Sequence, residues 1–361
     1  MFLVTFPAFL YFLNEDHYWY KSDIQKNYVN KHSNRTFFHS RAQMELTRVE
    51  PTIDQKSCNY MKPIAVFIHS SAQISGKYFT KRQILRKTWV TEVKRNNISV
   101  YFVIGMNGTQ SVDQRLKEEA EEYKDIVQFS FIDNYYNITL KAISILRWID
   151  RKCPKTKYIL KTDDDVLVNI NLLVDKLDSF ETGFSGQLLR YVGPQRVETD
   201  KWFIPPKYYP QTYFPNYMNG PAYVMAGPIV KQLVKTIDNY FGYVLDIDDL
   251  FISGIIAEKS GVERYESSYI KPYGCADVCV LHSSAVTFGC KSQEMLSLWT
   301  EWKNTSQVFC KNVYLKTFCL ISFTVLMILT TISLFIYIYC CYGFDRSYLS
   351  LKPFPYKRII L

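Results

Sequence analysis

From residue 63 onward, apolar runs alternate with charged stretches in a regular order. Three apolar runs predict buried β-strands at Ile64–Ser70, Ser99–Gly105 and Ile126–Phe131, because they are short and rich in β-branched and aromatic residues. The charged stretches between them, Lys81–Trp89 and Asp113–Tyr123, predict surface helices. Strands that alternate with helices indicate a mostly parallel α/β sheet.

One more helix and strand continue this pattern. Asn137 is a favourable residue for a helix N-cap. The apolar residues that follow it at helical spacing predict one buried face, formed by Ile138, Ala142, Ile145, Leu146 and Ile149. The run Lys157–Thr162 then predicts a fourth buried strand.

Beyond residue 183 the pattern changes. Gly, Pro, Tyr and Trp accumulate over Gly183–Pro228, and prolines at this density disfavour regular helix. Aromatic side chains can form platforms for sugar rings or bases, although any single Tyr here could equally pack in a core. The apolar run Leu250–Gly254 predicts a short helix that packs on the sheet.

The two ends of the chain differ from this central part. Residues 14–62 are polar and without sustained periodicity, so they are predicted to be a stem or linker. Residues 317–342 carry no charge and are long enough for a transmembrane helix. The tail, 343–361, is basic and predicted to be cytosolic, which places domain 63–312 in a lumen or outside the cell. Met1–Leu13 is apolar and could be a signal peptide, a truncated anchor or an artefact of where the chain starts.

Composition narrows the class of protein. The chain has 361 residues, 48% of them hydrophobic, as expected for a globular protein of one large or two medium domains. Its formal charge of +9 is partly confined to the tail and is no signature of nucleic-acid binding. There is no P-loop, GxGxxG, HExxH or GxSxG motif, so P-loop nucleotide hydrolysis and standard zinc or serine hydrolysis lack support.

Two features support a lumenal domain. Glycosylation sequons occur at Asn34, Asn97, Asn107, Asn137 and Asn304. Outside the apolar C-terminal segment there are six cysteines, an even number that is compatible with three disulfides of undetermined pairing: Cys58, Cys153, Cys275, Cys279, Cys290 and Cys310. A zinc site is disfavoured, because the CxxxC pair has no matching partner pair.

The most informative motif is a run of three carboxylates, Asp163, Asp164 and Asp165, directly after the fourth predicted strand. Isolated, such a run could be a solvated turn or a helix N-cap. At the carboxyl end of a parallel strand, where ligands bind in α/β sheets, it is better interpreted as a site for a divalent cation and substrate phosphates.

A second acidic cluster contains Asp246, Asp248 and Asp249. These carboxylates could complement the dipole of the helix that follows, or one of them could be a general base that faces the metal site. His282 follows an apolar run, where a structural role and metal ligation are both possible.

Several segments, in the same order, resemble the inverting β-1,3-galactosyltransferase and β-1,3-N-acetylglucosaminyltransferase family of the Golgi, to which the fringe enzymes are distantly related. The resemblance covers residues 63–302, and the segments that carry it are Arg82–Trp89, Tyr123–Lys141, Tyr158–Asn169, Tyr213–Tyr223, Asp248–Gly254, His282–Ser283 and Gln293–Trp299.

The resemblance implies a GT-A-like, Rossmann-type sheet with a C-terminal acceptor-binding half. It also implies transfer of galactose or N-acetylglucosamine from a UDP-sugar to a glycan acceptor, with Mn²⁺ as cofactor, in the Golgi lumen. The roles that it suggests are metal ligation by Asp165 and His282, contact with ribose or metal-bound water by Asp163 and Asp164, and catalysis by the base Asp249.

A further implied role, donor-nucleotide binding by Arg86, rests on a weaker match. The sequence also departs from the family pattern in two places. Asp248 stands where the family usually has Glu, and the apolar span is C-terminal where the family is usually anchored N-terminally. An impaired family member that acts as a lumenal chaperone or glycan-binding protein is therefore the alternative function. A metal-dependent nuclease or phosphatase could also use clustered aspartates, but the lumenal features disfavour it.

Overall fold

A computed structural model describes six parts of the chain: residues 38–39, 49–73, 77–271, 274–275, 278–305 and 307–342. The chain divides into two compact units, Met1–Asn304 and Thr305–Leu361. Met1–Leu13, most of the predicted stem, the sequon Asn34 and the basic tail lie outside the described residues.

The first unit is built on an eight-stranded mixed sheet with the strand order β11-β8-β9-β6-β3-β4-β5-β2. Four central strands, β6, β3, β4 and β5, are mutually parallel, and β9 joins β6 in the antiparallel direction. The predicted parallel α/β core is therefore confirmed. The strands are β2 (Pro51–Ile53), β3 (Ile64–His69), β4 (Ser99–Met106), β5 (Ile126–Ile132), β6 (Tyr158–Asp163), β8 (Phe184–Leu189), β9 (Tyr217–Ala226) and β11 (Arg264–Glu266).

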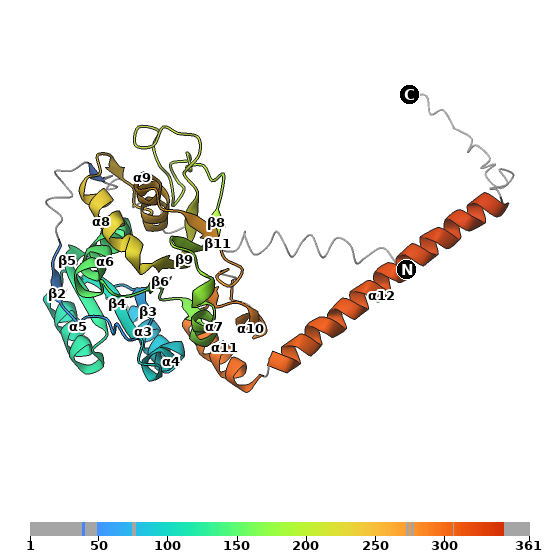
Figure 1. Cartoon of the computed structure of the whole chain (residues 1–361), viewed down its shortest axis with the longest axis horizontal. Helices are drawn as coiled ribbons and strands as arrows, with labels where there is room; N and C mark the ends of the chain where they lie inside the picture. The colour runs from blue at the N-terminus through green and yellow to red at the C-terminus, as the bar shows by residue number, and fades with distance from the viewer. Residues whose placement is uncertain are drawn as a thin grey trace, which may run out of the picture. The chain divides into compact units, whose positions relative to one another are not determined.

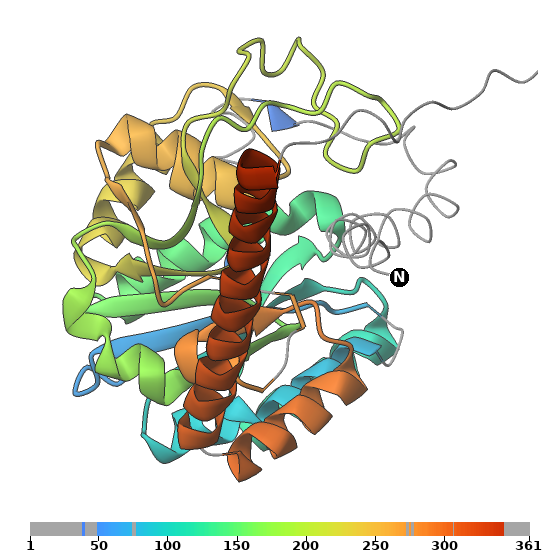
Figure 2. The same cartoon turned by 90° about the vertical axis from the view of Figure 1, so that its right-hand side faces the viewer.

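Helices cover both faces of the sheet (Figures 1 and 2). Helices α3 (Lys77–Lys87), α4 (Trp89–Arg95) and α5 (Gln110–Tyr123) lie on one face, and α6 (Ile138–Lys152), α8 (Val230–Asp238) and α9 (Ala257–Ser260) lie on the other. Such coverage explains why β3 is buried along its whole length, since a parallel sheet with both faces covered needs apolar strands.

Helix α6 shows how the pattern of the sequence produces this packing. Four of the five residues of its predicted apolar face, Ala142, Ile145, Leu146 and Ile149, are in the core, and Ile138 is half-buried. Trp148 of the same helix is fully buried and meets the rings of Phe67 and Tyr101 edge-on.

The predicted cap at the start of α6 is wrong in its detail. The side chain of Asn137 makes no capping hydrogen bond and instead donates to the carbonyl of Ile132. The cap is one turn earlier, where the side chain of Asn134 accepts a hydrogen bond from the Asn137 amide at the start of a short 3₁₀ turn, Tyr135–Asn137.

Gly183–Pro228, where the sequence disfavours regular helix, begins with β8 and ends with β9. Between these strands, the connection of residues 190–216 projects from the sheet as a long loop, yellow-green in Figures 1 and 2. Strand β9 tolerates Gly220 and Pro221 because the register shifts there: Gly186 pairs with Tyr223, but Leu188 pairs with Met218. The prolines therefore mark a bulge in a strand.

Smaller elements complete the first unit. Two short antiparallel pairs join β7 (Val166–Val168) with β12 (Val286–Phe288) and β1 (Phe38–His39) with β10 (Tyr243–Val244). The remaining helical elements are η3 (Leu177–Ser179), η4 (Gly227–Ile229), the π-helix η5 (Leu250–Ile256), α7 (Ile170–Asp175), α10 (Val280–Ser283) and α11 (Ser292–Asn304).

Disulfides confirm part of the cysteine prediction. Cys58 is bonded to Cys153, and Cys275 to Cys290. Cys279 and Cys310 are disulfide-bonded as well. The first bond joins the segment before β3 to the end of α6 and so closes the core on one side.

The second unit contains helix α12 (Gln307–Tyr342), and the predicted transmembrane segment 317–342 lies within it. Its residues 322–337 are exposed, whereas nothing is described for the side chains of 317–321 and 338–342. In the portion of the chain for which a structure is described, no helix has the length and apolarity that crossing a membrane requires. The membrane span is therefore not confirmed and stays a prediction from the sequence.

Candidate functional site

The strand order places a topological switch point between β3 and β6. The chain moves from β3 through β4 to β5 in one direction, and then returns to form β6 on the other side of β3. At this point His69 and Asp163, the last residues of the two strands, are register partners. Ligands of α/β sheets bind where the strand order reverses in this way, so the aspartates lie at the expected edge.

The three aspartates occupy different environments. Asp163 ends β6, whereas Asp164 and Asp165 form the turn to β7. The run therefore lies at the predicted strand end and includes a turn, and its role as a cation site stays a prediction. Burial raises the pKa of Asp163 to about 7, although the nearby ammonium of Lys161, 2.7 Å from its Oδ1, favours the charged form.

Asp164 is held by residues of the segment that follows β3. Its Oδ2 accepts a hydrogen bond from Ser70 Oγ at 2.8 Å, and Lys81 Nζ lies 2.6 Å from its Oδ1. Burial raises the pKa of Asp164, while Lys81 acts in the opposite direction. Asp165 is the most exposed member of the run: its side chain is 41% exposed, against 33% for Asp163, and lies 3.5 Å from Lys81 Nζ.

The second acidic cluster immediately precedes η5. Asp249 caps this element, since its Oδ1 accepts a hydrogen bond from the Leu250 amide at 3.0 Å. Burial and the neighbouring Asp248 raise the pKa of Asp249 to about 7. The predicted short helix is a π-helix, a rare form that is frequent at functional sites. The cap confirms the interpretation of this cluster as a helix N-terminus, and the role of Asp249 as a general base stays a prediction.

The fold brings the two clusters together around one ammonium group. Lys161 Nζ lies 2.7 Å from Asp163 Oδ1 and 3.5 Å from Asp248 Oδ2. His69 Nδ1 lies 3.5 Å from the same Asp248 oxygen. Burial, followed by the charges of Lys161 and Lys141, lowers the pKa of His69 well below its usual value, so this imidazole is neutral.

Sequence reasoning missed Lys161, Lys81 and His69. A signal was present for Lys161, because a lysine inside a predicted buried strand needs a buried counter-charge, and Asp163 follows on the same face two residues later. No comparable signal marked Lys81 or His69. Their partners lie 83 and 179 positions away in the sequence, and only the sheet brings them together.

The other candidate metal ligand, His282, lies in α10. It is half-buried, and its ring centroid is 5.9 Å from that of Trp302. The side-chain Nδ2 of Asn169 donates to the Leu281 carbonyl at 2.7 Å, which joins α10 to the end of β7, the strand that begins after Asp165. Within the described ranges, no three His, Cys, Asp or Glu side chains are grouped so that they could hold a metal. Joint ligation by Asp165 and His282 stays a prediction.

Arg86 lies in a buried ion-pair network whose members are outside the run Asp163–Asp165. Its guanidinium bonds Asp125 at 2.7 Å and Glu119 at 2.7 Å, and it stacks 3.9 Å from the centroid of the Tyr123 ring. Glu119 also binds Arg82 at 2.6 Å. The structure thus accounts for Arg86 through packing and charge pairing, and its predicted contact with a nucleotide stays a prediction.

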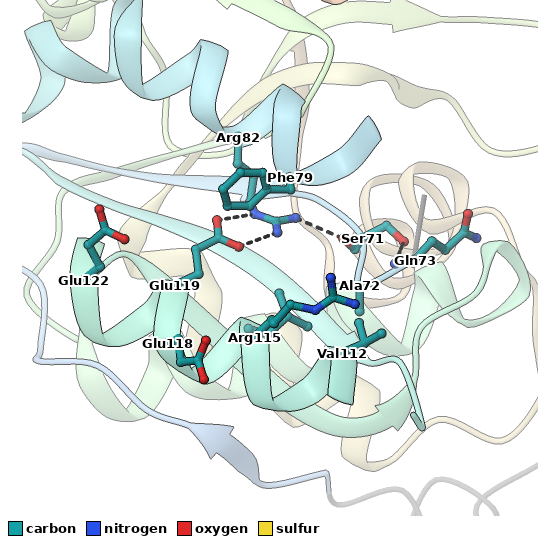
Figure 3. Close-up of a pocket in the computed structure, with 11 residues that line it drawn as sticks. Ser71, Ala72, Gln73, Phe79, Arg82, Val112, Arg115, Glu118, Glu119 and Glu122 are labelled. Carbon is teal, nitrogen blue, oxygen red and sulfur yellow. Dashed lines mark hydrogen bonds and ion pairs between the residues drawn. The ribbon is translucent and has the colours of Figure 1, made fainter. Parts of the chain in front are cut away.

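Arg82 and Glu119 contribute to a pocket between α3 and α5 with a volume of about 380 Å³ (Figure 3). Phe79 and Arg82 line it from α3, and Arg115 lines it from α5. Its third side is the segment 71–73, which follows β3, and Arg82 donates to the Ser71 carbonyl there. Because the preceding residue, Ser70, binds Asp164, this wall is continuous with the aspartate site.

The long loop 190–216 carries exposed aromatic rings. Tyr191, Trp202 and Tyr213 are 82%, 44% and 57% exposed, and the rings of Tyr191 and Tyr213 meet edge-on. Lys201 Nζ lies 4.4 Å from the ring centroid of Tyr135. Burial raises the pKa of the Tyr135 phenol, as do the charges of Asp248 and Asp249, so the loop reaches the second acidic cluster through Tyr135.

Comparison with known proteins gives two results. The sequence model of the family described as "Galactosyltransferase" matches residues 80–268. Mouse beta-1,3-galactosyltransferase 1 is 27% identical over 265 residues, which cover 71% of this chain and 79% of that protein. Human beta-1,3-galactosyltransferase 5 is also 27% identical over 265 residues, covering 71% of this chain and 84% of the relative.

Solved structures resemble the chain only distantly. The apo structure of the bifunctional glycosyltransferase WbbM aligns with a TM-score of 0.37 and 10% identity, over 69% of this chain and 50% of that one. A Drosophila galactosyltransferase 7 mutant in complex with manganese, UDP-Gal and xylobiose aligns with a TM-score of 0.28 and 13% identity, over 56% of this chain and 64% of that one. These TM-scores are too low to support an argument.

Proposed function

The chain belongs to the galactosyltransferase family, and from this premise we propose that it transfers galactose or N-acetylglucosamine from a UDP-sugar to a glycan acceptor. The proposed product is a β-1,3 linkage formed with inversion at the anomeric carbon. The relatives that match over most of the domain are named beta-1,3-galactosyltransferases, which supports a hexosyltransferase.

One observation carries this proposal: two separate carboxylate clusters meet at the switch point of the sheet. Asp163 lies at the end of β6 and Asp249 at the start of η5, and Lys161 contacts the first cluster at Asp163 and the second at Asp248. A glycosyl transfer that inverts configuration needs a donor site and a base on opposite sides of the reacting carbon. Two carboxylate clusters that both contact the buried ammonium of Lys161 fit this requirement.

We assign the base to Asp249. Its pKa of about 7 suits a general base, because about half of this group is ionised at pH 7 and the carboxylate has appreciable affinity for a proton. Asp249 takes the proton of the acceptor hydroxyl as its oxygen forms a bond to the anomeric carbon. The bond between that carbon and the diphosphate breaks at the same time, and the electron pair leaves with the diphosphate.

The carboxylates at the end of β6 suit the donor side of the reaction. Oxygen ligands of this kind fit Mn²⁺ or Mg²⁺, and Asp165 is the exposed member, with His282 as the proposed second ligand. When bound, such a cation stabilises negative charge on the departing diphosphate. Asp163 contacts the donor ribose, and Asp164 orients the turn through its bonds to Ser70 and Lys81.

The nucleoside part of the donor is proposed to occupy the pocket between α3 and α5. The pocket adjoins the aspartate site, and Phe79 and Arg115 offer an aromatic face and a cation. Arg86 would then act indirectly, since it holds Glu119 in the pocket wall.

Substitution tests the pocket. The variants Phe79→Ala and Arg115→Ala should each raise the KM for the UDP-sugar about threefold to tenfold, with a smaller effect on kcat, because they remove donor binding away from the reacting carbon. Glu121→Ala, on the exposed side of α5, is the control. An unchanged donor KM in both pocket variants would contradict the assignment.

Membrane attachment and location are proposals from the sequence. We propose that 317–342 anchors the chain in the Golgi membrane and that the catalytic domain faces the lumen, where disulfides persist. Carbonate extraction of membranes, followed by protease protection of the domain, tests both points.

The decisive test of function uses the full chain in detergent with UDP-galactose and UDP-N-acetylglucosamine over a panel of glycan acceptors, with and without MnCl₂. Transfer should depend on the metal and should fall at least about a hundredfold in Asp165→Ala. Asp178→Ala is the matched control, because the side chain of Asp178 is 96% exposed and remote in the sequence from both clusters. Full activity of Asp165→Ala would refute the assigned donor site. If the wild-type protein transfers no sugar but binds glycans, the alternative of a glycan-binding protein holds.

A further inference from the structure

A single ammonium group lies between the two carboxylate clusters, and it comes from the interior of β6. Lys161 Nζ is 2.7 Å from Asp163 Oδ1 and 3.5 Å from Asp248 Oδ2. It also donates a hydrogen bond to the Gly220 carbonyl at 2.7 Å. The three partners come from three different segments of the chain, and the Lys161 side chain is only 5% exposed.

Burial of the Lys161 ammonium has a cost in hydration free energy. An ammonium moved out of water loses several kcal/mol of hydration unless carboxylates and hydrogen-bond acceptors replace the water. Burial therefore opposes the charge on Lys161, but Asp163 and Asp248 outweigh it and raise the pKa of the ammonium. Lys161 is consequently a permanent cation, fixed in position by its partners.

The third partner connects Lys161 to the proposed base. Gly220 lies in the bulge of β9, where the register shifts. A Cβ atom at Gly220 would lie 2.9 Å from Asp249 Oδ2, so the backbone at this residue packs directly against the carboxylate. The hydrogen bond from Lys161 to the Gly220 carbonyl therefore fixes the backbone segment that packs against the Asp249 carboxylate.

We propose that Lys161 is a positioning residue for the transfer reaction. Its ammonium holds Asp163 on the donor side at a fixed place relative to Asp248 and the Gly220 backbone on the base side. The proposal rests on the proposed function, because it gives Lys161 a role in that reaction. Lys161 touches neither sugar, and it acts through the carboxylates and the backbone that it binds.

This position also has an electrostatic consequence for Asp249. The titratable groups that face Asp249 come from several elements, and Lys161 is the cation among them; the others are Asp163, Asp248 and the phenols of Tyr135, Tyr217 and Tyr223. A cation nearby favours an ionised carboxylate, and an anion disfavours it. Removal of Lys161 should therefore raise the pKa of Asp249, whereas removal of the Asp248 charge should lower it.

These opposite shifts provide the test. We would measure kcat/KM for sugar transfer by the full chain, with saturating MnCl₂, from about pH 5 to about pH 9. The variants are Lys161→Met, Asp248→Asn and the double variant. Lys157→Met is the matched control, because Lys157 immediately precedes the same strand with a side chain that is 59% exposed.

In Lys161→Met, we expect the acid limb of the profile to move up by about one pH unit, which lowers kcat/KM about tenfold on that limb. In Asp248→Asn it should move down. A lysine needed for folding alone would reduce the amount of active protein and leave the midpoint of the limb unchanged. An unmoved limb in Lys161→Met, or shifts of the same sign in both variants, would overturn the proposal.

Lys161→Met leaves two carboxylates without their cation and could prevent folding. The comparison then is between Asp248→Asn and the double variant, in which a charge of each sign is removed. The limb of the double variant should lie at higher pH than that of Asp248→Asn, and coincident limbs would refute the role of Lys161. No transfer by wild type would reject the proposed function and this proposal with it, whereas an active wild type with unmoved limbs rejects this proposal alone.

Discussion

At the residue scale, the site depends on carboxylates whose protonation is set by burial. Asp163 and Asp249 both have a pKa of about 7, and burial is the largest cause for each. Asp165 is the most exposed of the three consecutive aspartates, with a side chain that is 41% exposed against 33% for Asp163. Acids of the two clusters therefore suit different tasks, with Asp165 on the metal side and Asp249 as the base.

The first residue-scale prediction concerns the base. Asp249→Asn should lower kcat by about a hundredfold to ten-thousandfold, the usual contribution of a general base, and should leave UDP binding in the presence of MnCl₂ unchanged. Isothermal titration calorimetry and a transfer assay measure the two effects. Because burial opposes the charge of this carboxylate, the variant should melt no lower than wild type above about pH 7. Retained transfer would exclude Asp249 as the base.

The pH dependence of wild type follows from the same group. A base must be deprotonated to accept a proton, so kcat/KM should fall as the pH drops below the pKa of Asp249, about 7. Initial rates across the pH range measure this limb, and Asp178→Ala is the control that should reproduce it. A rate that stays constant down to about pH 5 would mean that the catalytic group has an ordinary carboxyl pKa.

At the scale of elements, the site is made where regular structure is interrupted. Strand β6 ends in the turn of Asp164 and Asp165, β9 bulges at Gly220, and η5 is a π-helix capped by Asp249. Bulges and π-helical turns redirect side chains and are often found at functional sites. The regular parts of these elements pack in the core, and the irregular parts carry the residues of the candidate site.

The bulge in β9 gives a prediction at this scale. In Gly220→Ala the new Cβ would lie 2.9 Å from Asp249 Oδ2, so the carboxylate has to shift. We expect kcat to fall at least about tenfold with little change in the KM for the UDP-sugar, because the displaced group is a base and not a donor contact. Gly274→Ala, where a Cβ would have no atom within 4 Å, is the control. Equal kinetics in the two variants would show that Gly220 does not position the base.

At the scale of the whole molecule, the sheet connects parts of the chain that are far apart in sequence. Lys81 and Asp164, from α3 and the β6–β7 turn, meet because β3 and β6 are neighbours. His69, at the end of β3, meets Asp248, which precedes η5. The disulfide between Cys58 and Cys153 fixes the edge of this core across a sequence separation of 95.

Removal of that disulfide should destabilise the domain. Replacing both Cys58 and Cys153 by Ser should lower the free energy of unfolding by about 2–4 kcal/mol, since the bond restricts the unfolded chain over a long loop. Chemical denaturation of the variant and of wild type under non-reducing conditions measures the difference. Equal stability would mean that the folded state gains nothing from this bond.

Much of the fold could be predicted from the sequence. The strands at Ile64–His69 and Ser99–Met106 are mostly apolar, Tyr158–Asp163 begins with an apolar run, and the apolar face of α6 has helical spacing, so local pattern specifies them. The strands β8 and β9 were missed because their Gly and Pro residues are typical of loops. Pairing with β6 and a bulge stabilises β9 despite these residues, and pairing of this kind is not encoded locally.

The candidate site, like the fold, could be predicted only in part from the sequence. The carboxylates Asp163, Asp165 and Asp249 stand out in the sequence because acidic clusters next to apolar runs are unusual. The ion-pair network of Arg86 could not be predicted, since its partners, Glu119 and Asp125, belong to a different helix and the segment after it. A charged residue on a predicted helix can face solvent, a ligand or another charge, and only packing selects among them.

The sequence by itself therefore determined the α/β order of the domain, the family and the two groups of acidic residues. Tertiary structure decided how those groups are related: Lys161 binds both Asp163 and Asp248, and its bond to Gly220 fixes the backbone under Asp249. The physical reason is the different range of the interactions involved. Apolar periodicity and residue type act over a few neighbours along the chain, whereas charge pairing and burial act through space and depend on which strands are adjacent.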